Sequence, residues 1–259
     1  MNSSNEASTH IGQTAQAPGA SVPRVLIVTA VDAEKDAVLR GLGDNAAARF
    51  EVIAAGVGPA SAAAGTAAAL AYASPAAAAV PGPGSPTDTA NPPAPYALVV
   101  SAGIGGGFPG RAAVGSLVVA DAIVAADLGS QTPDGFLSVD ELGFGSSMVA
   151  ADAALAARLR QALERAGHAA SGGTAVTVST ATGTAEMAAE LLRRVPDAAA
   201  EGMEGFGVAT AAARFGIPVL ELRGISNAVG PRDRDAWRIK DALDALQTAS
   251  SILREVLTS

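Results

Sequence analysis

The sequence contains no cysteine, which excludes disulfide bonds, thiolate nucleophiles and cysteine-ligated metals. It holds only two histidines, His10 and His168, which are too few for a metal site built from histidine. No segment has about 18 strongly apolar residues in a row, so no stretch is typical of a transmembrane helix. These absences favour a soluble protein without a membrane partner, and the lack of cysteine fits a cytoplasmic location.

Basic residues are also fewer than acidic ones. The 17 Lys and Arg residues stand against 25 Asp and Glu, which gives a net charge of −8 at pH 7. Such a charge disfavours non-specific binding to nucleic acid or to an anionic membrane, so we expect neither partner. Hydrophobic residues make up 49% of the chain, but the excess is mostly alanine and indicates a compact soluble protein. At 259 residues the chain can form one large α/β domain or at most two small ones.

Two segments lack regular patterning. Residues 1–22 are small and polar, without the basic start and apolar core of a signal peptide, and we expect a disordered tail. Residues at about 73–95 are rich in Pro, Ala, Gly and Ser, which predicts a surface insertion between a helix and the next strand. The expected domain therefore spans residues 23–259 with this one insertion.

The rest of the chain alternates apolar runs with helix-prone segments. Strands are predicted at 24–31, 50–55, 96–102, 114–125, 174–179 and 217–225, and helices at 33–42, 59–71, 151–166, 185–194, 204–215 and 235–257. Strands separated by helices predict a mixed, mostly parallel sheet covered by helices on both faces. Because open α/β sheets bind ligands at the carboxyl ends of their strands, polar residues at those ends are the candidates for function.

Glu34 follows the first predicted strand, at the start of the first predicted helix. This position suits a carboxylate that faces a ligand site. Asp32 and Glu34 could equally do no more than complement the helix dipole, an effect of about 0.3–1 kcal/mol. The residues alone leave both interpretations open.

A glycine cluster, Gly103-Ile104-Gly105-Gly106-Gly107, follows the third predicted strand. Its backbone N–H groups could approach an anion or a sugar closely, or the cluster could be a plain tight turn. It is not a dinucleotide fingerprint, because Phe108 and Pro109 follow, and it is not a P-loop, because no Gly-Lys-Ser/Thr follows.

The segment Glu201-Gly202-Met203-Glu204 opens a small, apolar helical run. A carboxylate can accept two hydrogen bonds side by side, which suits the vicinal hydroxyls of a ribose. We predict this role for Glu204 and assign Glu201 to the helix dipole. Met203 would pack against the sugar face, although methionine in such a place is commonly core.

Ser226-Asn227 ends the last predicted strand. An asparagine amide offers one donor and one acceptor to a purine edge, but an asparagine before Val-Gly-Pro is also a common turn former. In the charged run that follows, Arg232 and Arg234 could hold a substrate carboxylate, or the run could be a solvated loop with Asp235 capping the last helix. Trp237 is predicted to be core or interface.

Three parts of the sequence resemble segments of the nucleoside phosphorylase and nucleosidase superfamily, and they follow one another in the same order as in that superfamily. They are Val28–Glu34, Ala102–Gly107, and Gly202–Glu204 together with Arg223–Asn227. The similarity covers roughly residues 24–256 apart from the Pro-rich insertion, and it implies a nucleoside phosphorylase-like α/β/α domain. Within the superfamily the chain is most similar to the futalosine hydrolase family, which removes hypoxanthine from futalosine in the alternative menaquinone pathway. Glu201–Phe206, Arg223–Arg234 and Gly129–Gly145 carry that similarity.

The resemblance implies a role for each matched residue. Glu34 activates the water, and Asn227, oriented by Ser226, stabilises the departing purine. Met203 and Glu204 hold the ribose, and the backbone at Gly103, Ile104 and Gly105 approaches the substrate. Nucleosidases of the adenosine type have Asp where this chain has Asn227, so the resemblance favours hypoxanthine over adenine. It requires no metal or redox cofactor.

An aromatic side chain is expected to stack on the purine near Ala181 and Thr182, where this sequence has none. Thr182 is therefore a predicted contact, and Phe206, Phe136 or Phe144 could supply the ring. The last two would reach across the interface of a homo-oligomer, a dimer or larger.

Two other functions fit the same segments. A phosphorylase acting on 6-oxopurine nucleosides would need a phosphate clamp, but the corresponding positions hold Ser101 and Ile104. A non-catalytic nucleoside-binding protein would be expected to lack Glu34 or Glu204, and both are present.

Overall fold

The computed structural model describes residues 23–44, 46–73 and 96–258. The predicted tail at 1–22 lies outside these residues, and so does the predicted insertion apart from Ala73. In the described part of the chain, no helix combines the length and the apolar character needed to cross a membrane.

A ten-stranded mixed sheet forms the centre of the molecule. Its strands are β1 (Arg24–Thr29), β2 (Phe50–Ala54), β3 (Tyr96–Gly107), β4 (Leu117–Val119), β5 (Ala122–Ala125), β8 (Met148–Ala150), β9 (Ala170–Ser171), β10 (Thr174–Thr177), β11 (Ala198–Gly202) and β12 (Val219–Ala228). The order is β8-β5-β10-β11-β3-β12-β4-β9, with β1 between β2 and β3. Most of the pairings are parallel, while β3–β11, β4–β12 and β5–β8 are antiparallel.

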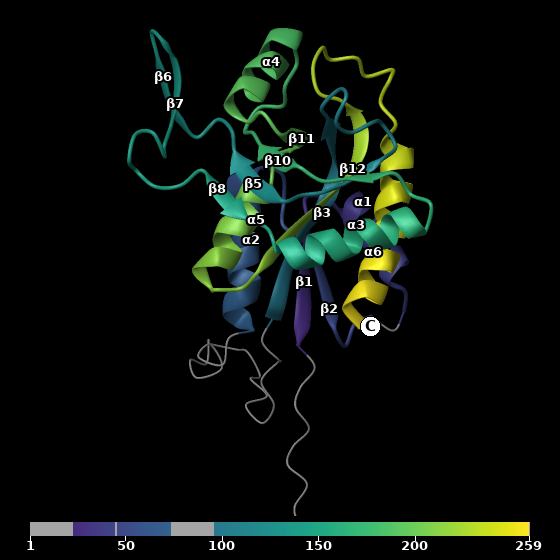
Figure 1. Cartoon of the computed structure of the whole chain (residues 1–259). Helices are drawn as coiled ribbons and strands as arrows, with labels where there is room; N and C mark the ends of the chain where they lie inside the picture. Colours follow the sequence, from purple (N-terminus) through teal and green to yellow (C-terminus); the bar gives the residue numbers. More distant parts are fainter. Residues whose placement is uncertain (1–22, 45, 74–95, 259) are drawn as a thin grey trace, which may run out of the picture.

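Helices cover both faces of the sheet (Figure 1). On one face lie α1 (Asp32–Leu42), α3 (Ala153–Arg165) and α6 (Ile239–Thr258), and on the other lie α2 (Pro59–Tyr72) and α5 (Gly205–Arg214). A further helix, α4 (Ala185–Arg194), packs near β10, and a separate hairpin of β6 (Gly129–Thr132) and β7 (Gly135–Ser138) projects from the body. The predicted three-layer α/β/α fold is confirmed.

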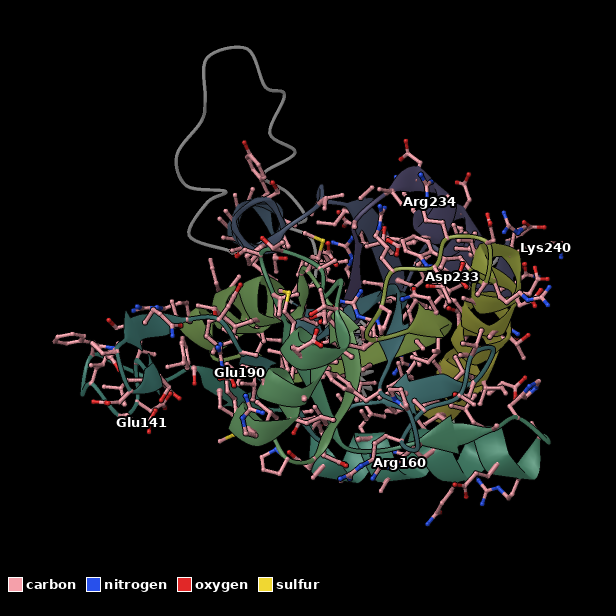
Figure 2. The ribbon with its side chains drawn as sticks, turned by 90° about the horizontal axis from the view of Figure 1, so that it is seen from above. Glu141, Arg160, Glu190, Asp233, Arg234 and Lys240 are labelled. Carbon is pink, nitrogen blue, oxygen red and sulfur yellow. The ribbon has the colours of Figure 1, made fainter. Side chains whose placement is uncertain are left out.

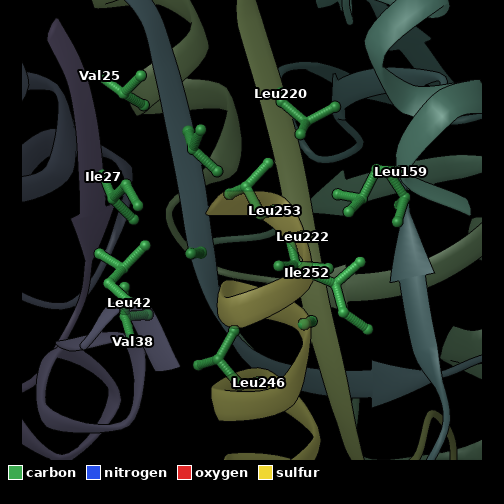
Figure 3. Packing of buried hydrophobic residues seen from close by; sticks show 14 of the residues in the cluster. Val25, Ile27, Val38, Leu42, Leu159, Leu220, Leu222, Leu246, Ile252 and Leu253 are labelled. Carbon is green, nitrogen blue, oxygen red and sulfur yellow. The ribbon is translucent and has the colours of Figure 1, made fainter. Parts of the chain in front are cut away.

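Alternating side chains of each central strand supply the two cores. In β1, Val25 and Ile27 pack with α1 and α6, while Leu26 and Val28 pack with α2 and α5. Figure 3 shows the first core, where Leu246 and Leu253 of α6 lie against the sheet. Because both faces are buried, the strand reads as a continuous apolar run, which is why its position could be predicted.

Three strand predictions need correction. The run at 114–125 is not one strand, because the chain leaves β12 after β4 and joins β10 as β5. Asp121 fixes the break by accepting from Gly173 N (2.8 Å) and Arg160 Nη1 (2.7 Å). The glycine cluster is not a turn, because β3 continues through it to Gly107. Strand β11 was not predicted, since its sequence Ala-Ala-Ala-Glu-Gly has low strand propensity.

The last helix also begins later than predicted. It starts at Ile239, so Asp235 lies in the preceding loop and does not cap it. Arg238 N instead donates to Ser226 O (2.7 Å), which ties this loop to the end of β12.

Candidate active site

A cavity of about 490 Å³ opens where β3, β11 and β12 end beside the start of α1. This volume is typical of a small-molecule site. Its lining residues come from six segments: Ala30, Val31, Glu34, Val57, Ile104, Gly105, Gly106, Ala181, Thr182, Glu201, Gly202, Met203, Glu204, Asn227, Ala228, Gly230, Pro231, Arg232, Asp233, Ala236 and Trp237. The loop from β12 to α6 forms one rim, and Figure 2 shows Asp233 and Arg234 on it from above.

Glu34 is held by backbone groups on both sides of its carboxylate. Oε2 accepts from Ala30 N (2.9 Å) and Val31 N (3.3 Å), and Oε1 accepts from Ile104 N (2.9 Å). The side chain is 4% exposed and reaches the cavity. It therefore both caps α1, as the dipole interpretation required, and presents an oxygen to the cavity, as the ligand interpretation required.

Gly103 makes room for this carboxylate. A Cβ at Gly103 would lie 2.6 Å from Glu34 Oε1 and 2.7 Å from Arg223 Nη1. A larger residue here would therefore displace the Glu34 carboxylate or the Arg223 guanidinium from its observed place. The glycine run is thus a strand whose side-chain space is filled by its neighbours.

Glu204 stands at the N-cap position of α5, next to Met203 on the cavity wall. Oε1 accepts from Gly58 N (3.2 Å), while Oε2 lies 3.3 Å from Met203 N and 3.4 Å from Arg223 Nη1. All three contacts are long, so the carboxylate retains capacity to accept hydrogen bonds from a ligand.

The Ser226–Asn227 pair is organised by a hydrogen bond between its own side chains. Ser226 Oγ donates to Asn227 Oδ1 (2.8 Å) and lies 3.1 Å from Gly105 O. Asn227 Nδ2 donates to Ala228 O (3.1 Å), and its second N–H has no partner among the described residues. The half-buried Asn227 therefore presents an amide N–H donor to the cavity, held in place by Ser226.

Beneath the cavity floor lies a buried ionic cluster around Arg223, which is 1% exposed. Its Nε donates to Glu221 Oε1 (2.8 Å), and Nη2 donates to Ser101 Oγ (3.1 Å). Nη1 faces Glu204 Oε2 at 3.4 Å and Ile104 O at 3.5 Å. Burial alone lowers the pKa of Arg223, but the charges of nearby glutamates outweigh it and raise that pKa above its ordinary value.

Glu201 is not a helix-dipole partner, contrary to the prediction. It lies in β11, 7% exposed, and lines the cavity. Its carboxylate accepts from Thr182 N (2.9 Å) and from the Thr182 hydroxyl. Burial raises its pKa, Asp127 raises it further, and the Thr182 hydrogen bonds oppose the rise.

Trp237 is half-buried on the rim and lines the cavity, so its predicted place in the core is wrong. The guanidinium groups of Arg232 and Arg234 lie 5.6 and 5.9 Å from its ring centroid. Among the described residues that line the cavity, Arg232 is the sole basic side chain, and Asp233 lies beside it.

Three predicted contacts do not line the cavity. Gly103 and Ser226 act behind it, on Glu34 and Asn227, and Phe206 packs toward the α2–α5 core. Of the other two phenylalanines, Phe136 lies under the Arg194 guanidinium at 3.9 Å, and Phe144 is 83% exposed.

A larger hollow of about 1060 Å³ lies between the β6–β7 hairpin and α4. It contains none of the residues predicted to be catalytic, and its Glu190 carboxylate forms ion pairs with both Arg193 and Arg194.

Across the described ranges, no group of three or more acidic or histidine side chains is arranged to hold a metal ion.

Comparison with known proteins shows to which family the chain belongs. Residues 43–259 match the model of the phosphorylase superfamily. Futalosine hydrolase of Streptomyces coelicolor is 52% identical over 252 residues, covering 91% of this chain and 97% of that protein. The chain belongs to the phosphorylase superfamily, and within it to the futalosine hydrolase family. Futalosine hydrolase of Acidothermus cellulolyticus is also similar, with 43% identity over 240 residues that cover 88% of this chain and 89% of that protein.

Solved structures of the superfamily share the fold. Native futalosine hydrolase of Helicobacter pylori strain 26695 superposes with a TM-score of 0.69 at 17% identity, over 92% of this chain and 98% of that one. The 5'-methylthioadenosine/S-adenosylhomocysteine nucleosidase of Neisseria meningitidis gives 0.68 at 18% identity, over 91% and 99%. The sequence resemblance to this superfamily is confirmed.

The observed roles of three polar residues of this futalosine hydrolase family member, Arg223, Glu221 and Glu201, were not predicted. Arg223 and Glu221 lie in an apolar strand sequence, and only their mutual spacing of two, which places them on one face, signalled a buried pair. Glu201 was hidden by the unpredicted β11. Arg234, which was predicted together with Arg232 as a possible carboxylate-binding residue, lies 5.9 Å from the Trp237 ring centroid and does not line the cavity.

Proposed function

We infer that this chain hydrolyses the N-glycosidic bond of futalosine, releasing hypoxanthine and dehypoxanthine futalosine for the alternative menaquinone pathway. One observation carries the mechanism: the carboxylates of Glu34 and Glu204, 170 residues apart in sequence, face the same cavity. The identity to curated futalosine hydrolases supports the choice of substrate.

The ribose would lie against Met203, with its 2′- and 3′-hydroxyls donating to Glu204. A carboxylate with long existing contacts can accept both. Holding the sugar in this way fixes C1′ in the cavity while the bond to the purine stretches toward an oxocarbenium-like state.

The water would be bound by Glu34 Oε1, whose partner among the described residues is Ile104 N. Water oxygen attacks C1′, the C1′–N9 bond breaks with its electron pair leaving on the purine, and the water proton passes to Glu34. A positioned general base of this kind contributes about 10²–10⁴-fold.

The purine would lie between Asn227 and Glu201, which both line the cavity. Both residues pair with Gly106, Asn227 from β12 and Glu201 from β11, so they lie on either side of the same strand. Asn227 can donate to N7 or O6, and an ionised Glu201 can accept from the N1–H of a 6-oxopurine. Adenine has no hydrogen at N1, so this arrangement favours hypoxanthine.

Water is favoured over phosphate by the charge of the cavity. Its lining includes Glu34, Glu201 and Glu204, which repel an anion, and Arg232 on the rim. Arg223, which lies beneath the cavity floor, directs its donors to Glu221, Glu204 and Ser101. Ser101 itself is 1% exposed and outside the lining, so it cannot clamp phosphate from the cavity.

Hydrolysis without phosphate is the direct test. Purified protein incubated with futalosine in phosphate-free buffer should release free hypoxanthine, measured by chromatography, and added phosphate should not raise the rate. Release that requires phosphate would make the chain a phosphorylase, and binding without release would make it a nucleoside-binding protein.

Replacing the amide donor should change the base preference. For Asn227→Asp, the ratio of kcat/KM for the 6-amino analogue to that for futalosine should rise about tenfold or more, because Asp can protonate N7. Glu201→Gln should lower kcat/KM for futalosine more than for the 6-amino analogue. An unchanged ratio in both variants would contradict this placement of the purine.

Several further points are part of the proposal. Arg232, whose guanidinium lies over the Trp237 ring at the rim, would bind a carboxylate at the far end of the substrate.

Residues 23–259 would act as one catalytic domain, in the cytoplasm. A homo-oligomer, a dimer or larger, would let Phe136 or Phe144 of a neighbouring copy approach the purine.

A further inference from the structure

A fourth carboxylate, Glu221, lies under the site without reaching the cavity. It is 1% exposed, in β12, on the same strand face as Arg223. Helix α5 closes over it at Gly205, where a Cβ would lie within 2.5 Å of its Cδ and Oε1. The fold therefore leaves space for this carboxylate by placing a glycine directly after Glu204.

The contacts of Arg223 are unequal. The Nε–Glu221 distance of 2.8 Å is that of a strong charge-assisted hydrogen bond, whereas the Nη1–Glu204 distance is 3.4 Å. Arg223 is thus held mainly by Glu221 through the inner edge of its guanidinium, and Glu204 receives only a weak contact.

This inequality matters because arginine and a carboxylate readily form two parallel hydrogen bonds. Without Glu221, the nearest carboxylate to the guanidinium would be Glu204. A two-point pair with Arg223 would occupy both oxygens that the proposed mechanism needs for the 2′- and 3′-hydroxyls.

We propose that Glu221 is a positioning residue that holds Arg223 by Nε and so keeps the Glu204 carboxylate free to bind the ribose hydroxyls. This inference rests on the proposed function, since it assigns the ribose to Glu204.

A purely structural role fits the contacts less well. Glu221 Oε2 has no hydrogen-bond partner among the described residues. Burial raises the pKa of Glu221, and the neighbouring Arg223 opposes that rise. A buried ion pair is weak evidence for stability, because an apolar pair of similar volume is often as stable.

The test is Glu221→Gln, which keeps the shape and one acceptor oxygen but removes the charge. We would measure kcat and KM with futalosine and with its 2′-deoxy analogue. With futalosine, kcat/KM should fall about tenfold or more, mainly through KM, because Arg223 turns toward Glu204. With the 2′-deoxy analogue, which lacks one hydroxyl bound by Glu204, the loss should be clearly smaller. Equal losses with both substrates, or no loss, would overturn the proposal.

Two further variants complete the design. Thr210→Val, on α5 with a buried hydroxyl that lacks a partner among the described residues, should leave both substrates unaffected. If Glu221→Gln does not fold by circular dichroism, Glu221→Asp replaces it, since the side chain, shorter by one methylene group, keeps the charge but draws the carboxylate back from Arg223 Nε. The same discrimination between substrates is then expected, and its absence overturns the proposal. Wild-type protein that releases no hypoxanthine would instead refute the proposed function.

Discussion

Glu34→Gln is expected to lower kcat for futalosine by about 10²–10⁴-fold, the contribution of a positioned general base. The glutamine oxygen can still accept from Ala30 N and Val31 N, so α1 keeps its cap. The amide nitrogen then takes the place of Oε1, where it can neither accept the hydrogen bond from Ile104 N nor take a proton from water. Substrate affinity should change little, which calorimetric titration of the inactive variant with futalosine would measure alongside steady-state kcat.

Asp32→Asn is the matched control for this experiment. Asp32 lies in the same first turn of α1, exposed and outside the cavity lining. Removing its charge alters the helix dipole interaction but not the reacting centre, so kcat should stay close to that of the wild type. Wild-type kcat in Glu34→Gln would mean that Glu34 only caps the helix.

Arg223→Met should lower the free energy of unfolding by about 3–5 kcal/mol, the usual result of breaking a buried pair from one side. The variant leaves Glu221 and Glu204 buried without their cation. Urea or guanidinium unfolding followed by circular dichroism would measure the loss.

The loss should shrink as the pH is lowered below neutral. Burial raises the pKa of Glu221, and removing Arg223 takes away the charge that lowers it. A carboxyl whose pKa is higher in the folded state binds protons more tightly there, so protonation favours folding as pH falls. Arg160→Met, which breaks the more exposed pair with Asp121, should cost about 1 kcal/mol or less and serves as the control. A similar loss in both variants would contradict the buried cluster.

The sequence allowed the layered fold and the places of two cavity residues to be predicted for the same reason. Strands buried on both faces have continuous apolar sequences, and their ends are marked by polar residues such as Glu34 and Asn227. A carboxylate before an alanine-rich helix can serve the helix dipole or a ligand, and Glu204 was assigned to the ligand because Glu201 was assigned to the dipole. Glu204 does line the cavity, but the structure places Glu201 in β11, so that assignment of Glu201 was wrong. Local patterns of this kind can be recognised from the sequence alone, without any information on tertiary contacts.

The remaining features depend on contacts between distant segments. Glu201 reaches the cavity because β11 pairs with β3, and alanine-rich β11 has no local strand signal. The glycine run extends as a strand because side chains from α1 and β12 fill the space beside it. Trp237 faces the cavity because the loop before α6 is tied to Ser226, a contact that no periodicity encodes.

The glycine half of β3 also bears on how such a site can diversify over evolutionary time. At Gly103, Gly105 and Gly106, a Cβ would collide with Glu34, the Glu201 carbonyl or Val229. Any substitution there displaces a neighbouring atom. These positions can therefore change in evolution only when residues in several segments change together. The rim formed by Pro231–Trp237 carries no such restriction, because its side chains are mostly exposed. Variation in substrate preference can therefore accumulate on the rim while the strand beneath the reacting centre stays fixed.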